Sequence, residues 1–198
     1  MTKLSTNKSY GIDRNIMKLL VNLIYRLLLT FNATSLIIVI YLVKEQCVLF
    51  TGYSNWFSYT FYALVPILLT LISIWLSRFL TEDNLVSKND QDAIIQVEQA
   101  NNAFLPSYLG YFFVAVSVDY FETLIFVFII LFVFTYLSQT LYFNPLFLLF
   151  GFNFYYVTTF KNVKIFLITR KQLKVPQGLS LKTLRRINDY TFIQNKKD

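Results

Sequence analysis

Residues 123–134 read TLIFVFIILFVF, a run in which the only polar side chain is that of Thr123. A helix of about 20 mainly apolar residues crosses the hydrocarbon core of a bilayer, and the apolar character here extends over residues 120–137. Comparable stretches occupy residues 21–43, 56–79 and 141–157. The sequence therefore predicts a mainly α-helical integral membrane protein with four transmembrane helices.

The composition agrees with this class. The chain has 198 residues, of which 56% are hydrophobic and 19% aromatic. A soluble domain of this length has too little interior to bury so many aromatic side chains, whereas lipid covers them. The bilayer is therefore the first expected partner of the chain.

The distribution of positive charge predicts the orientation. Sixteen of the 18 Lys and Arg residues lie on one side of a model with four crossings, counting Arg78 at the end of the second span, and the exceptions are Arg26 and Lys44. Because cytoplasmic loops carry the excess of Lys and Arg, both termini are expected in the cytoplasm. The last 38 residues alone hold ten of these cations against two acids, a net charge of +8.

This topology divides the chain into five parts. Residues 1–20 form a basic cytoplasmic arm, residues 21–79 a first transmembrane hairpin, and residues 80–119 a cytoplasmic insertion of one helix and one strand. Residues 120–160 form a second antiparallel hairpin, and residues 161–198 form a basic cytoplasmic tail. The insertion and the tail are expected to build a small α+β cap below the membrane.

Residues 104–118 are also apolar, but they number only 15 and contain Pro106 and Gly110. A fifth crossing there would reverse the charge bias. The abundance of β-branched and aromatic residues favours a strand, which we expect to pair with residues 163–169 of the tail. A re-entrant or interfacial helix is the alternative.

The cap is expected to join acidic and basic parts. Residues 82–98 of the insertion are mainly acidic, and helical spacing of Ala93, Ile94, Val97 and Ala100 predicts a helix over residues 90–102. Ion pairs with the tail are expected, either within one protomer or between protomers.

A second helix is predicted over residues 181–187, after Ser180 as its N-cap. It carries Lys182, Arg185 and Arg186, which we regard as candidate contacts for a cytoplasmic partner. The alternatives for these cations are the orientation bias alone and attraction to anionic lipid headgroups. The chain carries no nucleic-acid-binding motif, so direct binding to nucleic acid is not expected.

The residues needed for most enzyme chemistry are missing from the sequence. The chain has no histidine and a single cysteine, Cys47, which excludes His-based triads and thiolate zinc sites. No phosphate-binding glycine loop or nucleophile elbow occurs. We therefore expect a protein that is not an enzyme and that has no catalytic, cofactor or metal site.

Polar residues within the predicted spans are the remaining candidates. Asn32 in the first span and Asn153 in the fourth are expected to hydrogen-bond to neighbouring helices or subunits. Asp119 and Glu122 are expected to cap the third span at its cytoplasmic edge. A proton or cation site, or an ion pair with Arg26 or the tail, is the alternative for these two carboxylates.

Three segments of the last 50 residues carry a family resemblance. They are GFNFYYVTT at 151–159, KIFLITRK at 164–171 and LRRINDYTFI at 184–193. Placed after apolar spans in a chain of this length, they resemble the KwaA family, the membrane subunits of the Kiwa anti-phage system. The resemblance implies a bacterial inner-membrane protein that forms a homo-oligomer, senses phage at the envelope and works with a cytoplasmic DNA-binding partner, KwaB.

Residues and resemblance together predict a non-enzymatic sensor and scaffold of the inner membrane. Envelope perturbation would shift the packing of the helices, and the cytoplasmic cap would relay this change to the partner. Two alternatives stay open. One is an immunity protein against a pore-forming toxin, and the other is an oligomeric channel or holin-like pore lined by polar residues such as Asn32.

Overall fold

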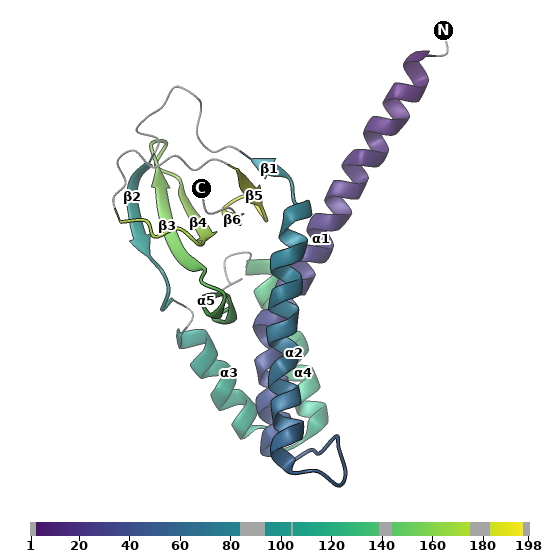
Figure 1. The fold of residues 1–198 in the computed structure, drawn as a ribbon, viewed down its shortest axis with the longest axis vertical. Coiled ribbons are helices and arrows are strands. Elements are labelled where there is room, and N and C mark those ends of the chain that lie inside the picture. The colour runs from purple at the N-terminus through teal and green to yellow at the C-terminus, as the bar shows by residue number, and fades with distance from the viewer. Residues whose placement is uncertain (1–2, 84–93, 104, 139–143, 175–182, 196–198) are drawn as a thin grey trace.

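The chain folds into a group of long helices and a small β-sheet at one end of them (Figure 1). The computed structural model describes residues 3–83, 94–103, 105–138, 144–174 and 183–195, with only the backbone of residues 3–15. The helices are α1 (Lys3–Lys44), α2 (Asn55–Leu76), α3 (Leu105–Ser117), α4 (Phe121–Ser138) and the short α5 (Leu146–Leu149), with a 3-10 turn, η1, at Ser77–Phe79.

Three helices are long and apolar enough to cross a membrane. They cover Ile16–Lys44, Asn55–Phe79 and Phe121–Ser138. Only 11% of the last of these is buried within the protein, so the surface of α4 suits contact with lipid better than contact with water. The prediction of a mainly helical chain with membrane-length helices is confirmed, but the described residues contain three such helices and not four.

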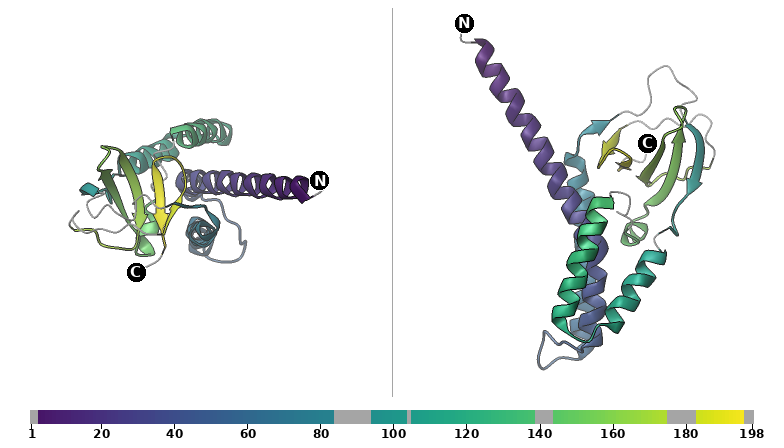
Figure 2. Two further views of the ribbon diagram at one scale, coloured as in Figure 1. Left: turned by 90° about the horizontal axis from the view of Figure 1, so that it is seen from above. Right: turned by 180° about the vertical axis from the view of Figure 1, so that it is seen from behind.

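The helices connect two ends of the molecule. α1 runs from the sheet end to the far end, α2 returns, α3 leads away from the sheet again and α4 returns (Figures 1 and 2). α3 has 13 residues, about 20 Å of helix at 1.5 Å per residue. Because they run in opposite directions, α3 and α4 form the second antiparallel pair of helices. The N-terminal half of α1 projects beyond the sheet end.

The sheet has six strands in the order β1-β5-β6-β4-β3-β2. β4 and β6 are parallel, and every other neighbouring pair is antiparallel. The strands are β1 (Glu82–Asp83), β2 (Ile94–Gln99), β3 (Asn153–Thr159), β4 (Lys164–Thr169), β5 (Leu184–Arg186) and β6 (Thr191–Gln194). The insertion supplies one strand to each edge and the tail region supplies the centre.

The predicted fourth span is wrong. Within residues 141–157 the structure has α5 and most of β3, while residues 141–143 lie outside the described part. Pro145 is the N-cap of α5, so no helix continues from the preceding residues through this point. Gly151 adopts φ +75° two residues before β3 begins, which ends the helical conformation after α5. Phe154, Tyr155 and Val157 are all buried, and a strand buried on both faces has the same continuous apolar run as a membrane helix.

The strand predicted within residues 104–118 is a helix, α3, and its proposed partner pairs elsewhere. β4 confirms the strand predicted at residues 163–169, but it pairs with β3 and β6. α3 places Tyr111 and Ala115 on one face against α1, where they pack with Ile37 and Tyr41. The spacing of four residues between these two buried positions is helical, and this packing overrides the β-propensity of the segment.

The two helices predicted for the cap are strands where the structure describes them. Ile94–Gln99, within the helix predicted at 90–102, is the edge strand β2. Leu184–Arg186, within the helix predicted at 181–187, is β5. Within the described residues the cap is accordingly a six-stranded sheet, because pairing with β3 and β6 satisfies backbone groups that a short isolated helix would satisfy poorly.

Candidate functional site: the junction between the helices and the sheet

The junction between the helices and the sheet is built around a large apolar cluster. Tyr25 and Leu29 of α1 belong to one apolar cluster with side chains of the sheet, and both are at most 1% exposed. Burial of this kind contributes about 1.5–3 kcal/mol per large side chain, so α1 is held firmly to the sheet. The other buried members are Leu80, Ala100, Phe147, Phe152, Phe154, Phe166, Ile168, Ile187 and Ile193.

A buried polar cluster lies beside it and joins three parts of the chain. Asn32 of α1, Thr70 of α2 and Asn144 before α5 are each at most 1% exposed. The orientation of the Asn32 amide that satisfies its neighbours has the nitrogen 3.1 Å from the Pro66 carbonyl oxygen and the oxygen 2.8 Å from Asn144 Nδ2. In the reversed orientation, the amide nitrogen of Asn32 would face that of Asn144, and both are donors. The Thr70 hydroxyl lies 2.8 Å from the same amide oxygen.

The carbonyl oxygen of Pro66, a proline within α2, also takes part in this cluster. It accepts a hydrogen bond from Thr70 Oγ1 at 2.9 Å in addition to lying near the Asn32 amide. In a low-dielectric environment, polar groups of this kind hold helices together because no water replaces them. α1, α2 and the chain entering the sheet are therefore fixed to one another at this point.

The end of α2 is joined to the C-terminal part of the sheet by further hydrogen bonds. Asn195, the residue directly after β6, donates a hydrogen bond from Nδ2 to Ser77 Oγ. Arg185 of β5 donates to the Leu80 carbonyl oxygen at 2.6 Å and forms an ion pair of 2.5 Å with Glu82. The end of α2 and the residues that follow it are thus joined to β5 and to the end of β6.

The expected contact between the acidic insertion and the basic tail is present within one chain. Besides the Arg185 pair, Arg186 Nη1 lies 3.7 Å from Asp83 and Lys164 Nζ lies 2.9 Å from Glu98. These groups are largely exposed, and each such pair contributes about 0–1 kcal/mol. They orient the edge strands more than they stabilise them.

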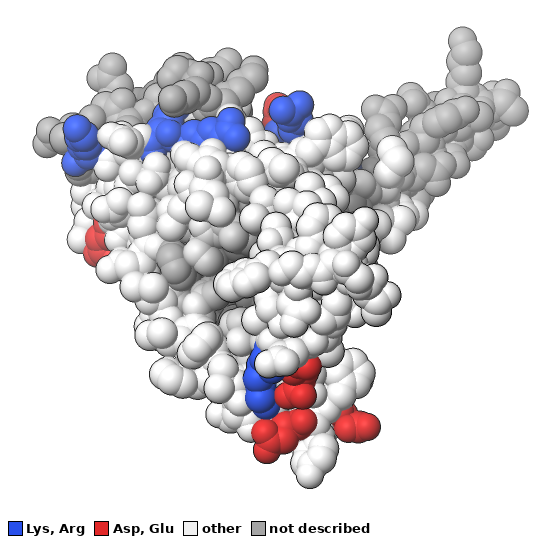
Figure 3. Space-filling view, turned by 60° about the horizontal axis from the view of Figure 1, so that its bottom comes forward, with Lys and Arg blue, Asp and Glu red and all other residues white. Residues whose placement is uncertain are grey.

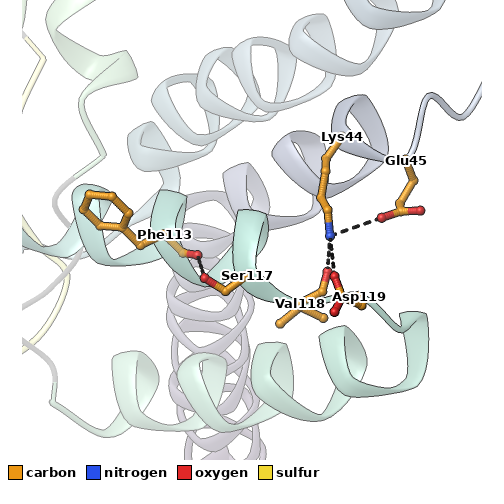
Figure 4. Close-up of polar contacts among 6 residues, drawn as sticks. All are labelled: Lys44, Glu45, Phe113, Ser117, Val118 and Asp119. Atoms are coloured by element: carbon orange, nitrogen blue, oxygen red, sulfur yellow. Dashed lines mark hydrogen bonds and ion pairs between the residues drawn. The ribbon is translucent and has the colours of Figure 1, made fainter.

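Charged side chains also gather at the far end of the helices, and an uncharged zone separates the two ends on the face shown in Figure 3. At the far end Lys44 Nζ donates to the Val118 carbonyl oxygen at 2.6 Å and lies 3.3 Å from both Asp119 and Glu45 (Figure 4). Asp119 and Glu122 therefore lie at the end opposite the sheet, because α3 carries the chain there. The predicted topology had placed them at the same end as the tail.

The predicted contact residues have different surroundings. Asn32 is fully buried within one chain, which removes it from the surface of any pore. Asn153 lies in β3 and accepts a hydrogen bond from Asn101 Nδ2 at 3.0 Å, outside the membrane-length helices. Arg185 and Arg186 lie together on β5, while Lys182 lies outside the described residues. Their contact with a partner stays a prediction.

Sequence reasoning missed Thr70, Asn144 and Asn195. The Asn144-Pro145 pair was a usable signal, because asparagine before proline favours the start of a turn and not a helix interior. Within the described residues, no group of three or more His, Cys, Asp or Glu side chains is arranged to hold a metal ion. The junction consists of apolar packing and hydrogen bonds that join α1 and α2 to the sheet.

A family described as anti-phage protein KwaA matches residues 25–193.

The chain belongs to the KwaA family.

The match runs from Tyr25 of α1 to Ile193 of β6, so it contains α1 from that residue onward, α2 to α5 and all of the sheet except its last residue, Gln194. The three segments that carried the resemblance lie within it. No curated protein and no solved structure matches the chain. Membership of the KwaA family implies a role in anti-phage defence.

Proposed function

We propose that this KwaA-family protein is a non-enzymatic sensor and scaffold of the bacterial inner membrane. Its helices respond to perturbation of the envelope during phage attack, and its sheet passes the response to a cytoplasmic, DNA-binding partner resembling KwaB. The observation that carries the proposal is the junction, where apolar packing and buried hydrogen bonds tie α1 and α2 to the sheet. A homo-oligomer of such chains would present several sheets to the partner.

The charge distribution supports a cytoplasmic sheet. α3 and α4 replace the predicted second hairpin, so the chain still passes an even number of times between the two ends. The basic N-terminal segment and the basic tail therefore remain on one side, as the rule on Lys and Arg in cytoplasmic loops requires. Figure 3 shows the uncharged zone that would lie within the bilayer.

Cys47 offers a direct test of this orientation, because it is the single cysteine of the chain and lies after α1 at the far end. In spheroplasts, a membrane-impermeant maleimide should label Cys47 without lysis. In a Cys47→Ser, Lys174→Cys variant it should label only after lysis. The reverse pattern would place the sheet outside the cytoplasm and refute the proposed relay.

The relay itself is tested by two matched substitutions on α2. Thr70 and Thr60 both donate to the carbonyl oxygen four residues earlier, but Thr70 is buried between helices and Thr60 is exposed. Thr70→Val removes the hydroxyl from the Asn32 cluster, and Thr60→Val leaves that cluster intact. We expect Thr70→Val to lose phage protection and Thr60→Val to retain it. Protection is measured as the plating efficiency of phage on cells that carry the native operon.

Membrane insertion and co-purification of the partner separate the possible causes. If Thr70→Val retains both and loses protection, the defect lies in the relay. If Thr70→Val retains full protection, helix coupling through this cluster is not needed and the proposed mechanism is wrong. If the wild-type chain inserts but brings down no soluble partner from the native operon, the scaffold role is wrong.

A further inference from the structure

The chain has two tryptophans, and both lie on α2 near the ends of its exposed apolar surface. Trp56 and Trp75 are 76% and 55% exposed. They are 19 residues apart, which is about 28 Å of helix at a rise of about 1.5 Å per residue. From Phe61 to Trp75 every exposed side chain of α2 is apolar, whereas the polar Thr70 and Ser73 are buried. This pattern is the reverse of that of a helix in water.

Arg26 of α1 lies at the same level as Trp75. α1 and α2 are antiparallel (Figure 1), and the Thr70 hydroxyl lies 2.8 Å from the Asn32 amide oxygen, which fixes their register. Arg26 is six residues before Asn32, on the side of the sheet. Trp75 is five residues after Thr70, on the same side. Both therefore lie about 7.5–9 Å from this contact. α4 reaches the same level, because Arg26 Cζ lies 5.1 Å from the centroid of the Tyr136 ring.

Lys44 of α1 lies at nearly the same level as Trp56, at the far end of the helices. Lys44 is 12 residues after Asn32, and Trp56 is 14 residues before Thr70. They therefore lie about 18 Å and 21 Å from the contact between the two helices. The chain between α3 and α4 is held at this level, because Lys44 Nζ donates to the Val118 carbonyl oxygen at 2.6 Å. The two levels are thus about 27–28 Å apart on both α1 and α2.

These levels have the chemistry of the two surfaces of a bilayer. Tryptophan and tyrosine are enriched where the hydrocarbon core meets water, and lysine and arginine extend to the headgroups from apolar helices. We infer that the protein fits a bilayer whose hydrocarbon core is about 28 Å thick, with Trp56 and Trp75 anchoring α2 at its two surfaces. A bilayer explains why the levels coincide on separate helices, because its surfaces are planes. A second copy packed on one helix would place no such requirement on the others.

Apolar length alone predicts a different inner surface. The apolar part of α1 begins at Ile16, ten residues before Arg26. A hydrocarbon core of about 30 Å that began there would hold Trp75 about 15 Å below its surface and would leave Trp56 in water. The depths of the two tryptophans therefore distinguish the two placements.

The inference rests on the membrane insertion proposed above, and it names hydrocarbon thickness as the property of the bilayer to which α2 responds. A core much thicker than the distance between the two anchors cannot keep both at its surfaces without deforming. Trp75 is two residues before Ser77, whose hydroxyl accepts a hydrogen bond from Asn195. A change in thickness would therefore act on α2 beside its contact with the sheet.

The depth of each tryptophan is measured in full-length chains that retain only one. Trp75→Phe leaves Trp56, and Trp56→Phe leaves Trp75. The matched control carries both of these substitutions together with Leu64→Trp, because Leu64 is an exposed residue of α2 that lies near the middle of the distance between the anchors. The chains are reconstituted into vesicles of phosphatidylcholine and phosphatidylglycerol with oleoyl chains or, for a thicker core, with erucoyl chains. Emission wavelength and quenching by acrylamide or by brominated acyl chains report depth.

In oleoyl vesicles we expect acrylamide to quench Trp56 and Trp75 to a similar extent, and brominated chains to quench both. The tryptophan of the Leu64→Trp control should be quenched by brominated chains alone. In erucoyl vesicles the emission of at least one anchor should shift to the blue and its quenching by acrylamide should fall, because the thicker core draws it below the surface. The control should not change.

The control separates the failure of this inference from that of membrane insertion. Acrylamide quenching of the Leu64→Trp control would refute insertion itself. With that control protected, a Trp75 that is equally protected and a Trp56 in water would move the inner surface toward Ile16 and overturn the inference. Protection of Trp75 from both quenchers would assign α2 to an interface between copies and also overturn it.

The response to thickness has its own contradiction. Identical depths of both anchors in oleoyl and erucoyl vesicles would show that the bilayer adapts to the protein, and hydrocarbon thickness would then not be the property to which α2 responds. Trp56→Tyr and Trp75→Tyr, which keep an interfacial side chain, replace the phenylalanine variants if those do not fold.

Discussion

α4 and β3 are both dense apolar segments, but they occupy opposite environments. In α4 only Leu124 and Thr135 are buried, whereas in β3 Phe154, Tyr155 and Val157 are buried on the two faces of the sheet. Hydropathy gives the free energy of removing a side chain from water and does not say whether lipid or protein replaces the water. The difference between the two segments therefore comes from their ability to continue as a helix.

Proline and glycine residues decide whether each segment can continue as a helix. α4 runs over 18 residues without proline or glycine. The apolar segment that contains β3, residues 141–157, has Pro145 near its start and Gly151 in its middle. Its helix, α5, has only four residues. The chain after Gly151 then has neighbours on both sides, β2 and β4, with which its backbone can pair.

The largest effect should come from truncating an aromatic ring in each environment. Phe154→Ala removes a ring that is fully buried between Phe147 and Phe166, so it should lower the free energy of unfolding of the sheet by about 3–5 kcal/mol. Phe134→Ala removes a ring that is 64% exposed and should change it by less than about 0.5 kcal/mol. Limited proteolysis of the detergent-solubilised chain at increasing temperature measures both. Equal losses would show that α4 is as buried as β3, for instance in a tight oligomer.

A charge placed in each segment should have the next largest effect. Phe126→Arg puts a cation near the centre of α4 and should oppose insertion by about 2.5–3.5 kcal/mol. Ile95→Arg puts the same charge on the exposed face of the edge strand β2 and should not affect insertion. The fraction of chain recovered in carbonate-washed membranes measures the difference. Complete insertion of Phe126→Arg would contradict a lipid-facing α4.

The smallest effect should come from the ion pairs at the edge of the sheet. Glu98→Gln removes the carboxylate that lies 2.9 Å from Lys164 Nζ, and both side chains are about half exposed. The expected loss is about 0–1 kcal/mol, and it should decrease further as salt is raised. Thermal unfolding at low and high salt measures it. A loss as large as that of Phe154→Ala would mean that this pair is buried in the assembled protein.

Other parts of the structure were within reach of the sequence. The three membrane-length helices, the strand β4 and the contact between acidic and basic segments all follow from apolar length, β-propensity and charge. The KwaA resemblance was found in residues that form β3 to β6, and the family match contains them. These features depend on local composition, which acts before the chain has any tertiary contacts.

The sequence by itself determined that the chain has long apolar helices, a biased charge distribution and no His-based or thiolate zinc site. Only the tertiary structure decided which apolar segments become helices, because α3 depends on packing against α1, and β3 depends on pairing with β2 and β4. It also brought Asn32, Thr70 and Asn144 together, 38 or more residues apart in the chain. Buried polar groups must find partners wherever the fold supplies them, and the fold, not their spacing, supplied these.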